Sequence, residues 1–273
     1  MGNMRRTKVV LFGILLCCVS IFFCTCFITA TAEHAPWDCP ECGRTGNTGN
    51  YCGGCAHPAP WIEDYVPHMT HKEYIETELD SEVVIESYVQ DHQSWWDNKV
   101  TVYLQSEDGA YFAYEMACSE EDAAKLVPGT KIRVTGYKGE WAGEVEIMDG
   151  TFEFVEAKPW LAEATDVTAL LDSAELEKHM NEFVAVRGAR IVAQEDGAAF
   201  HYKNPGEKTD DLYFSVDVEG KAYNFCVEFY LRGKDSDVYK AVEGLKVGDV
   251  VDIEGFLYWY NGPNLQATRV TVK

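Results

Sequence analysis

The sequence has few basic side chains for its length of 273 residues. It contains 23 Lys and Arg against 45 Asp and Glu, and its formal net charge at pH 7 is −22. Arg5, Arg6 and Lys8 are the only charged residues before Glu33, so the rest of the chain has 20 basic against 45 acidic residues, a charge of −25. A field of this sign repels nucleic-acid phosphates and anionic lipid headgroups. The composition therefore predicts that nucleic acid is an unlikely partner.

The sequence also lacks the local signatures of common enzyme active sites. Its seven histidines are scattered, and it has no metalloprotease helix motif, no G-x-S-x-G turn and no phosphate-binding glycine loop. The lone cysteines Cys118 and Cys226 are typical of small buried side chains rather than nucleophiles. The alternating acids Glu144 and Glu146 are expected on a solvated strand face. We predict that the protein is not an enzyme.

The one long apolar run lies at the N-terminus, where residues 9–32 carry no charge. Ala30-Thr31-Ala32 fits the cleavage pattern of a secretory signal, but about 20 apolar residues also suffice to cross a bilayer. We interpret residues 1–32 as a hydrophobic helix that is either a signal peptide or a membrane anchor. Because the basic cluster precedes the run, the positive-inside rule predicts an extracytoplasmic protein, secreted or held at the membrane by this segment if it is uncleaved.

Four cysteines form two C-x-x-C pairs separated by nine residues. They are Cys39, Cys42, Cys52 and Cys55. Four thiolates complete the tetrahedral shell of a structural zinc ion and leave no open position for chemistry. We predict a zinc ribbon over residues 36–61 with Zn²⁺ as a structural cofactor, which supplies on the order of 10 kcal/mol of folding free energy. Export would also permit two disulfides at these positions, and this alternative stays open.

Two β-rich segments follow a linker and short helix over residues 62–79. Period-two alternation predicts five strands in each segment, with a short helix between the third and fourth. This is the element order of the OB-fold, a small Greek-key barrel. We predict OB-like domains over residues 80–157 and 166–273, with a β-sandwich as the alternative. The segments ending at Gly136 and Gly255 align best and indicate a duplication.

The residues from Trp37 to Trp61 read W-D-C-P-E-C-G-R-T-G-N-T-G-N-Y-C-G-G-C-A-H-P-A-P-W and resemble the short zinc ribbons of bacterial membrane and surface proteins. The β-rich pattern that follows resembles the OB-like domains of secreted bacterial proteins. Together these features resemble membrane-targeted or secreted bacterial proteins with a zinc ribbon and tandem OB-like domains, a family whose function is undetermined.

Aromatic residues concentrate in the loops that OB-folds use for binding. In the first domain they are Trp95, Trp96, Tyr137 and Trp141, and in the second they are Tyr258, Trp259 and Tyr260. Such side chains can stack on sugars, bases or peptide side chains, or they can close the barrel ends. We hypothesise that Trp95, Trp96 and Trp141 form an exposed binding ledge.

Taken together, these patterns predict a non-enzymatic extracytoplasmic protein that binds or scaffolds an unknown protein or cell-envelope ligand. An alternative is a nucleic-acid-binding protein built from the barrels and the ribbon, and the charge of −25 predicts no measurable affinity for single-stranded DNA at physiological salt. A third interpretation is a hydrolase of cell-envelope polymers, which a cleft of paired carboxylates would support.

Overall fold

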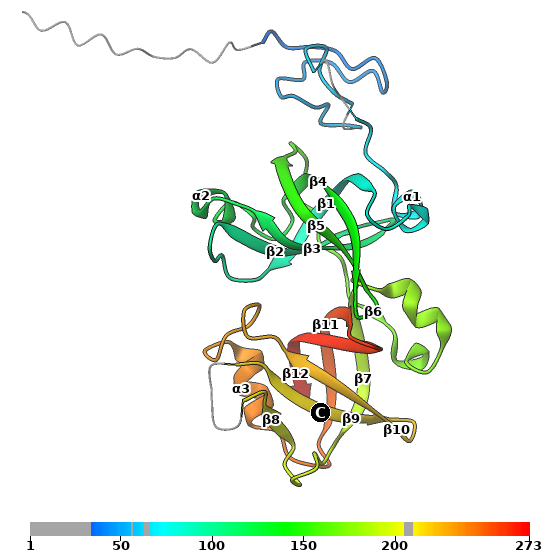
Figure 1. Ribbon diagram of the computed structural model, residues 1–273, viewed down its shortest axis with the longest axis vertical. Coiled ribbons are helices and arrows are strands. Elements are labelled where there is room, and N and C mark those ends of the chain that lie inside the picture. Colours follow the sequence, from blue (N-terminus) through cyan, green and yellow to red (C-terminus); the bar gives the residue numbers. More distant parts are fainter. Residues whose placement is uncertain (1–33, 56, 63–65, 205–209) are drawn as a thin grey trace, which may run out of the picture. The chain divides into compact units, whose positions relative to one another are not determined.

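The computed structural model describes residues 34–55, 57–62, 66–204 and 210–273 (Figure 1). The predicted N-terminal hydrophobic helix and its cleavage site lie outside these residues. In the part of the chain that is described, none of the helices combines the length and apolarity needed to cross a bilayer. The described residues between 36 and 273 form one compact unit, which contains the four cysteines and every strand assigned in them.

The first barrel is closed by five strands in the order β1-β2-β3-β5-β4. Neighbouring strands are antiparallel except β3 and β5, which pair in parallel at Ala113 and Ile147. Helix α2 (Glu120–Ala123) lies between β3 and β4, and the Ser119 side chain caps it by accepting a hydrogen bond from the Asp122 N–H. The strands are β1 (Glu82–His92), β2 (Lys99–Ser106), β3 (Gly109–Ala117), β4 (Lys131–Trp141) and β5 (Glu144–Phe154).

The second barrel repeats this topology. Its strands pair in the order β7-β11-β12-β10-β9, and β7 also pairs with β9, which closes the ring. The parallel pair recurs between β10 and β12 at Cys226 and Gln266. The strands are β7 (Phe183–Val192), β9 (Leu212–Val218), β10 (Lys221–Val227), β11 (Val250–Trp259) and β12 (Pro263–Val272). Both halves therefore have the strand order of the OB-fold, and the β-sandwich alternative is wrong.

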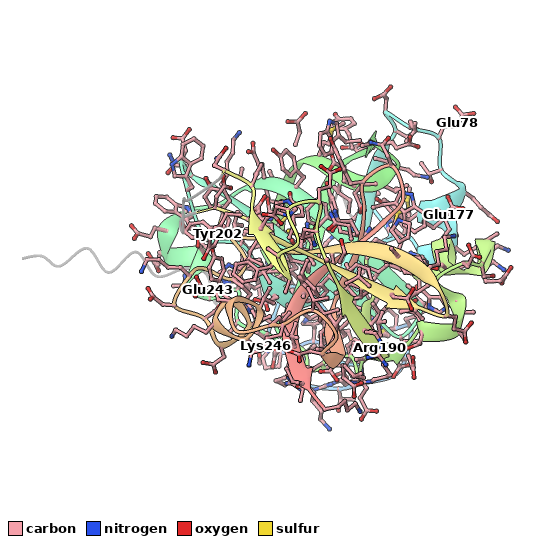
Figure 2. All side chains as sticks on the ribbon, turned by 90° about the horizontal axis from the view of Figure 1, so that it is seen from below. Glu78, Glu177, Arg190, Tyr202, Glu243 and Lys246 are labelled. Carbon is pink, nitrogen blue, oxygen red and sulfur yellow. The ribbon has the colours of Figure 1, made fainter. Side chains whose placement is uncertain are left out.

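Short elements complete the chain around the two barrels. Helix α1 (His71–Glu76) precedes the first barrel, and the 3₁₀ helices η1 (Thr168–Leu170) and η2 (Ala174–His179) precede the second. Strand β6 (Thr165–Asp166) pairs with β7, and β8 (Phe200–Tyr202) pairs with β9. The Tyr202 hydroxyl at the end of β8 donates to Glu243 at the end of α3 (Asp237–Glu243), and both residues can be followed in Figure 2.

The two glycines that align in sequence occupy the same crowded position in the fourth strand of each barrel. A Cβ at Gly255 would lie 2.2 Å from the Gln266 carbonyl oxygen, and one at Gly136 would lie 2.7 Å from the Met148 carbonyl oxygen. Both strands change register at this point. The duplicated glycine is thus required because the neighbouring backbone approaches too closely for any side chain.

Gly255→Ala is expected to lower the free energy of unfolding by about 3 kcal/mol, because the clash is with backbone that cannot rotate away. Urea denaturation of the full chain measures this. Gly233→Ala is the matched control, since its Cβ would meet only the Phe229 carbonyl oxygen at 3.8 Å. Equal stability of the two variants would show that the close approach is not what the glycine serves.

The second barrel packs on the outer face of β2 and β3 of the first. Tyr103 stacks on Phe256 with ring centroids 4.4 Å apart, and its hydroxyl donates to Gln266. The Phe183 N–H donates to the Gln105 side chain at 2.8 Å. Tyr103, Phe112, Leu231 and Phe256 form a small buried cluster at this contact. The outer face of the first barrel, which would be solvated in an isolated OB-fold, is therefore partly buried.

Candidate functional site

The four predicted metal ligands converge in the ribbon, where any two of their sulfur atoms lie within 4.8 Å of one another. Cys39 and Cys55 have sulfurs 3.4 Å apart, and those of Cys42 and Cys52 are 3.5 Å apart. Disulfide sulfurs are about 2.05 Å apart, and these four cysteines are free thiols. Four sulfurs bound to one zinc ion lie roughly 3.8 Å from each other. The arrangement therefore fits a tetrahedral metal site better than two disulfides.

The two halves of the cysteine cluster are joined by Asn47, which is buried. Its amide donates to the carbonyls of Trp37 and Arg44, and its oxygen accepts from the Gly53 N–H at 3.2 Å. Bridges between Trp37 and Asn47 and between Tyr51 and Pro58 are the sheet pairings of this segment. The ribbon has almost no core, because the buried apolar residues among its described positions are Trp37, Cys39, Tyr51, Cys52 and Ala59. A bound metal would thus supply most of its stability.

The ribbon is docked on the first barrel through polar contacts. The Tyr51 hydroxyl donates to Glu153 of β5 at 2.9 Å, and the Arg133 guanidinium lies over the Tyr51 ring. Arg133 also pairs with the buried carboxylate of Glu86 at 3.2 Å, as does Lys131 at 2.9 Å. Burial and the hydrogen bond to Glu153 raise the pKa of Tyr51 to about 12, so it stays a donor at neutral pH. The metal site is in this way tied to β4 and β5.

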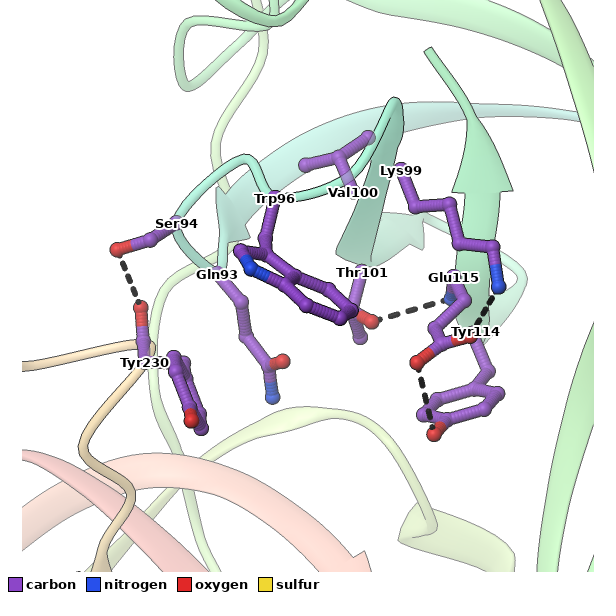
Figure 3. A pocket seen from close by; sticks show the side chains of 9 residues that line it. All are labelled: Gln93, Ser94, Trp96, Lys99, Val100, Thr101, Tyr114, Glu115 and Tyr230. Atoms are coloured by element: carbon purple, nitrogen blue, oxygen red, sulfur yellow. Dashed lines mark hydrogen bonds and ion pairs between the residues drawn. The ribbon is translucent and has the colours of Figure 1, made fainter. Parts of the chain in front are cut away.

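A second site, the Trp96 pocket, lies where the first barrel meets the second. Its volume is about 270 Å³. Figure 3 shows Trp96 with Tyr230 on one side and Tyr114 on the other. These rings come from the β1–β2 loop, the chain after β10 and strand β3, and they are 67%, 59% and 43% exposed in that order. The pocket is lined by Gln93, Ser94, Trp96, Lys99, Val100, Thr101, Tyr114, Glu115 and Tyr230.

Backbone geometry explains how the pocket presents Trp96. Asp97 and Asn98 form a two-residue turn with φ angles of 48° and 59°, and Trp96 pairs with Lys99 across it. Two consecutive positive φ angles are typical of a type I′ hairpin turn, which asparagine and aspartate tolerate. Glu115 also has a positive φ, 45°, and its N–H donates to the Thr101 hydroxyl at 3.1 Å. The pocket therefore has a rigid turn on one edge and a constrained strand on the other.

The charged residues of the pocket neutralise each other. The Lys99 ammonium lies 2.7 Å from the Glu115 carboxylate, which also accepts from the Tyr114 hydroxyl. The hydrogen bond from Lys99 lowers the pKa of Glu115, and the same pair raises the pKa of Lys99. Ser94 fixes Tyr230 by donating from its N–H to the Tyr230 carbonyl at 2.8 Å. The pocket thus offers aromatic faces, an amide and a neutral ion pair.

The structure distributes the predicted ligand-binding aromatics over three environments. Trp96 lines the pocket, whereas Trp95 packs against the core of the first barrel and donates from its indole to the Cys118 carbonyl at 2.9 Å. The Trp141 ring lies against that of Tyr260 of the second barrel, with centroids 5.2 Å apart and the planes tilted by 36°. The Trp96 pocket includes neither Trp95 nor Trp141, so the predicted ledge of three tryptophans is not one surface.

The other two predicted residues lie at the contact between the barrels. The Trp259 ring packs over Gly143, and the backbone N–H of Trp259 donates to the Glu144 carboxylate at 2.7 Å. Tyr258 lies edge-on against Phe112 at 5.4 Å. Sequence reasoning missed the pocket residues Gln93, Lys99, Tyr114, Glu115 and Tyr230. Tyr114 follows from strand alternation once the outer face is known, but no local signal points to Tyr230, which is contributed by the other barrel.

Glu144 and Glu146 are buried, which corrects the prediction of a solvated face. They alternate along β5 with Val145 and Ile147, which face the core of the barrel, but the second barrel contacts their face through Trp259, and Glu144 is 0% exposed. Burial raises the pKa of Glu144 to about 8 and that of Glu146 to about 7. Neither residue lines the Trp96 pocket. The chain does have paired carboxylates, but they are sealed inside a contact rather than set in a cleft.

The comparisons with known proteins show similarity of fold at a distance. No family model matches the chain, and no curated protein sequence matches it. One similar solved structure is the tetrameric p202 HIN2, with a TM-score of 0.31 and 12% identity over 72% of this chain and 96% of that one. A murine DNA-binding protein bound to double-stranded DNA has a TM-score of 0.31 and 11% identity over 70% and 98%. A replication protein A heterotrimer bound to single-stranded DNA has a TM-score of 0.26 and 9% identity over 77% and 70%.

Proposed function

We propose that this chain is a non-enzymatic binding protein whose ligand occupies the Trp96 pocket. The observation that carries the proposal is the set of exposed rings of Trp96, Tyr114 and Tyr230, held by a rigid turn and by a barrel contact. Exposed aromatic side chains in a concave site with a few polar groups are typical of ligand sites. OB-folds bind across strands two and three and the adjoining loops, and this is the part of that face that the second barrel leaves open.

The chemistry of the pocket fits an uncharged glycan. Sugar rings have apolar faces that stack on tryptophan and tyrosine, and hydroxyl groups that pair with amides and carboxylates. Gln93 and the Glu115 carboxylate supply such polar partners, while the Lys99 partner cancels the charge of Glu115. The overall charge of −22 opposes polyanionic ligands. An extracytoplasmic location, which we also propose from the N-terminal segment, would place the pocket among cell-envelope polymers.

The ribbon is proposed to bind one structural Zn²⁺ through its four cysteines. The thiolates fill all four positions of a tetrahedral shell, so the metal would contribute folding energy rather than catalysis. The contacts of Tyr51 with Glu153 and Arg133 would then hold the ribbon against the barrel that contains the pocket.

Trp96→Ala is expected to weaken binding of an uncharged oligosaccharide at least about tenfold, because it removes the most exposed ring of the pocket. Isothermal titration of the full chain with cello-, malto- and N-acetylchito-oligosaccharides measures this. Tyr137→Ala is the control, since Tyr137 is a 46% exposed aromatic residue of the same barrel that lies outside the pocket. Unchanged binding by Trp96→Ala, or loss in both variants, would contradict the assignment.

A single strand of nucleic acid is the second candidate, because the same exposed rings can stack bases. A twenty-nucleotide oligothymidylate is the probe. Tight binding that weakens steeply with salt and is lost in Trp96→Ala would favour this candidate over a glycan. The proposal predicts instead no binding at physiological salt.

Release of reducing ends from the oligosaccharides used in the titrations would establish a hydrolase and contradict the non-enzymatic assignment.

A further inference from the structure

Aromatic side chains continue beyond the Trp96 pocket along the outer face of the first barrel. On β3, Phe112 lies two residues from Tyr114 on the same face, and their rings stack with centroids 6.4 Å apart. Phe112 in turn contacts the ring of Tyr258 from β11 at 5.4 Å. Phe112 is buried, so it forms the base of this surface, whereas Tyr114 remains 43% exposed. The row of rings thus passes from the first barrel to the second.

The row ends at a pair of highly exposed rings. Tyr260 follows Tyr258 by two residues, and its ring lies 5.2 Å from that of Trp141. Trp141 and Tyr260 are 56% and 52% exposed. Burial is the main cause that raises the pKa of Tyr258, and Glu144, Glu146, Tyr114 and Tyr260 raise it further. Tyr258 therefore lies near Tyr114 of the pocket and near Tyr260 of the terminal pair.

The hairpins that hold the terminal pair are fixed to each other. The Asn261 N–H donates to the Ala142 carbonyl at 2.7 Å, and the Trp259 ring packs against Gly143. Ala142 and Asn261 have φ angles of 53° and 53°, as expected for tight hairpin turns. Two exposed aromatic rings that are held by this much backbone are pre-organised, and pre-organisation reduces the entropy lost when a ligand binds.

We propose that the Trp96 pocket and the Trp141–Tyr260 pair are the two ends of one binding track, and that the ligand is a polymer of several uncharged sugar units. The exposed rings of the track are those of Trp96, Tyr114, Tyr260 and Trp141, and the buried Phe112 and half-buried Tyr258 support the surface between them. This inference rests on the proposed function. A single sugar would fill only the pocket of about 270 Å³, and the terminal pair would then have no ligand to contact.

The charges along the track agree with an uncharged polymer. Lys99 and Glu115 pair with each other, and the neighbouring Glu144 and Glu146 are buried under the contact between the barrels. Burial favours the neutral form of both carboxyl groups. The track itself is made of aromatic side chains and offers a polyanion no cation, whereas a neutral chain could stack on its exposed rings.

The test compares short and long ligands on the full chain. Trp141→Ala and Tyr260→Ala are each expected to weaken binding of a six-unit oligosaccharide about fivefold to tenfold and to leave binding of its two-unit form unchanged. Trp96→Ala is expected to weaken both, and Tyr137→Ala neither. Isothermal titration gives the affinities, and the thermal midpoint of each variant reports whether it is folded.

The possible outcomes distinguish an error in the track from an error in the proposed function. If Trp141→Ala and Tyr260→Ala bind the six-unit ligand as tightly as the unchanged protein while Trp96→Ala does not, the track is wrong and the pocket stands. If Trp96→Ala binds every oligosaccharide normally, the proposed function is itself wrong. An affinity of the unchanged protein that does not rise with ligand length also overturns the track.

Discussion

Cys52→Ser is expected to abolish metal binding and to unfold residues 36–61 while both barrels stay folded. Among the described residues of the ribbon only five apolar side chains are buried, so its fold is expected to depend on the shared metal, whereas each barrel has its own core. Loss of a structural zinc ion removes on the order of 10 kcal/mol of folding free energy from such a module. Elemental analysis should give one zinc per chain before the substitution and none after it. Hydrogen exchange should rise to the unprotected rate in the ribbon alone.

Cys118→Ser is the control for this experiment. Cys118 is also a buried thiol, but it lies in the first barrel, where it donates to the Ser119 carbonyl at 3.2 Å. A serine hydroxyl can make the same bond, so the variant should keep its zinc. An unsubstituted chain that contains two disulfides and no metal, as judged by intact mass, would contradict the zinc assignment.

Glu144→Gln is expected to stabilise the protein at pH 8.5 by up to about 4 kcal/mol and to flatten the dependence of stability on pH. Glu144 has a pKa of about 8 in the folded protein, mainly because of burial, against an ordinary value of 4.5. Between these values the unfolded chain has lost this proton and the folded chain has kept it. The contribution of this group to the free energy of unfolding is therefore largest below about pH 4.5 and is lost as the pH rises to about 8. Glutamine keeps the acceptor for the Trp259 N–H without the ionisable group.

Urea denaturation at pH 5, 7 and 8.5 measures this effect. Glu146 and Glu228 also have pKa values raised to about 7 by burial, so a smaller loss of stability with pH should persist in the variant. Glu140→Gln, an exposed position on the same hairpin, is expected to behave like the unchanged protein. Parallel pH profiles for Glu144→Gln and the unchanged chain would show that Glu144 is not the group responsible.

Local signals in the sequence predicted the elements but not their surroundings. The spacing of Cys39, Cys42, Cys52 and Cys55 is sufficient to predict a cluster of four sulfurs, because two tight turns bring these atoms together whatever lies nearby. Alternation predicted the ten barrel strands because one face of each strand must be apolar. Glu144 and Glu146 were misassigned by the same rule, since alternation shows which residues point outward but not what covers them.

The candidate site depended on contacts between distant parts of the chain. Trp95 and Trp96 are adjacent and chemically identical, yet one is turned into the barrel core and the other stands on a hairpin turn. Tyr230 reaches the pocket from the second barrel because Ser94 binds its carbonyl, a contact between residues far apart in sequence. No periodicity within one segment contains this information.

The scarcity of basic residues could be determined from the composition alone. The four-cysteine cluster and the duplicated barrel could be predicted from residue spacing and alternation. These properties depend on residue type and on spacing within a few turns or strands. The tertiary structure alone decided that the second barrel covers part of the outer face of β2 and β3, leaves an open pocket at Trp96 and buries Glu144. The physical reason is that the burial of a surface residue is determined by the element that packs against it, and that element lies elsewhere in the chain.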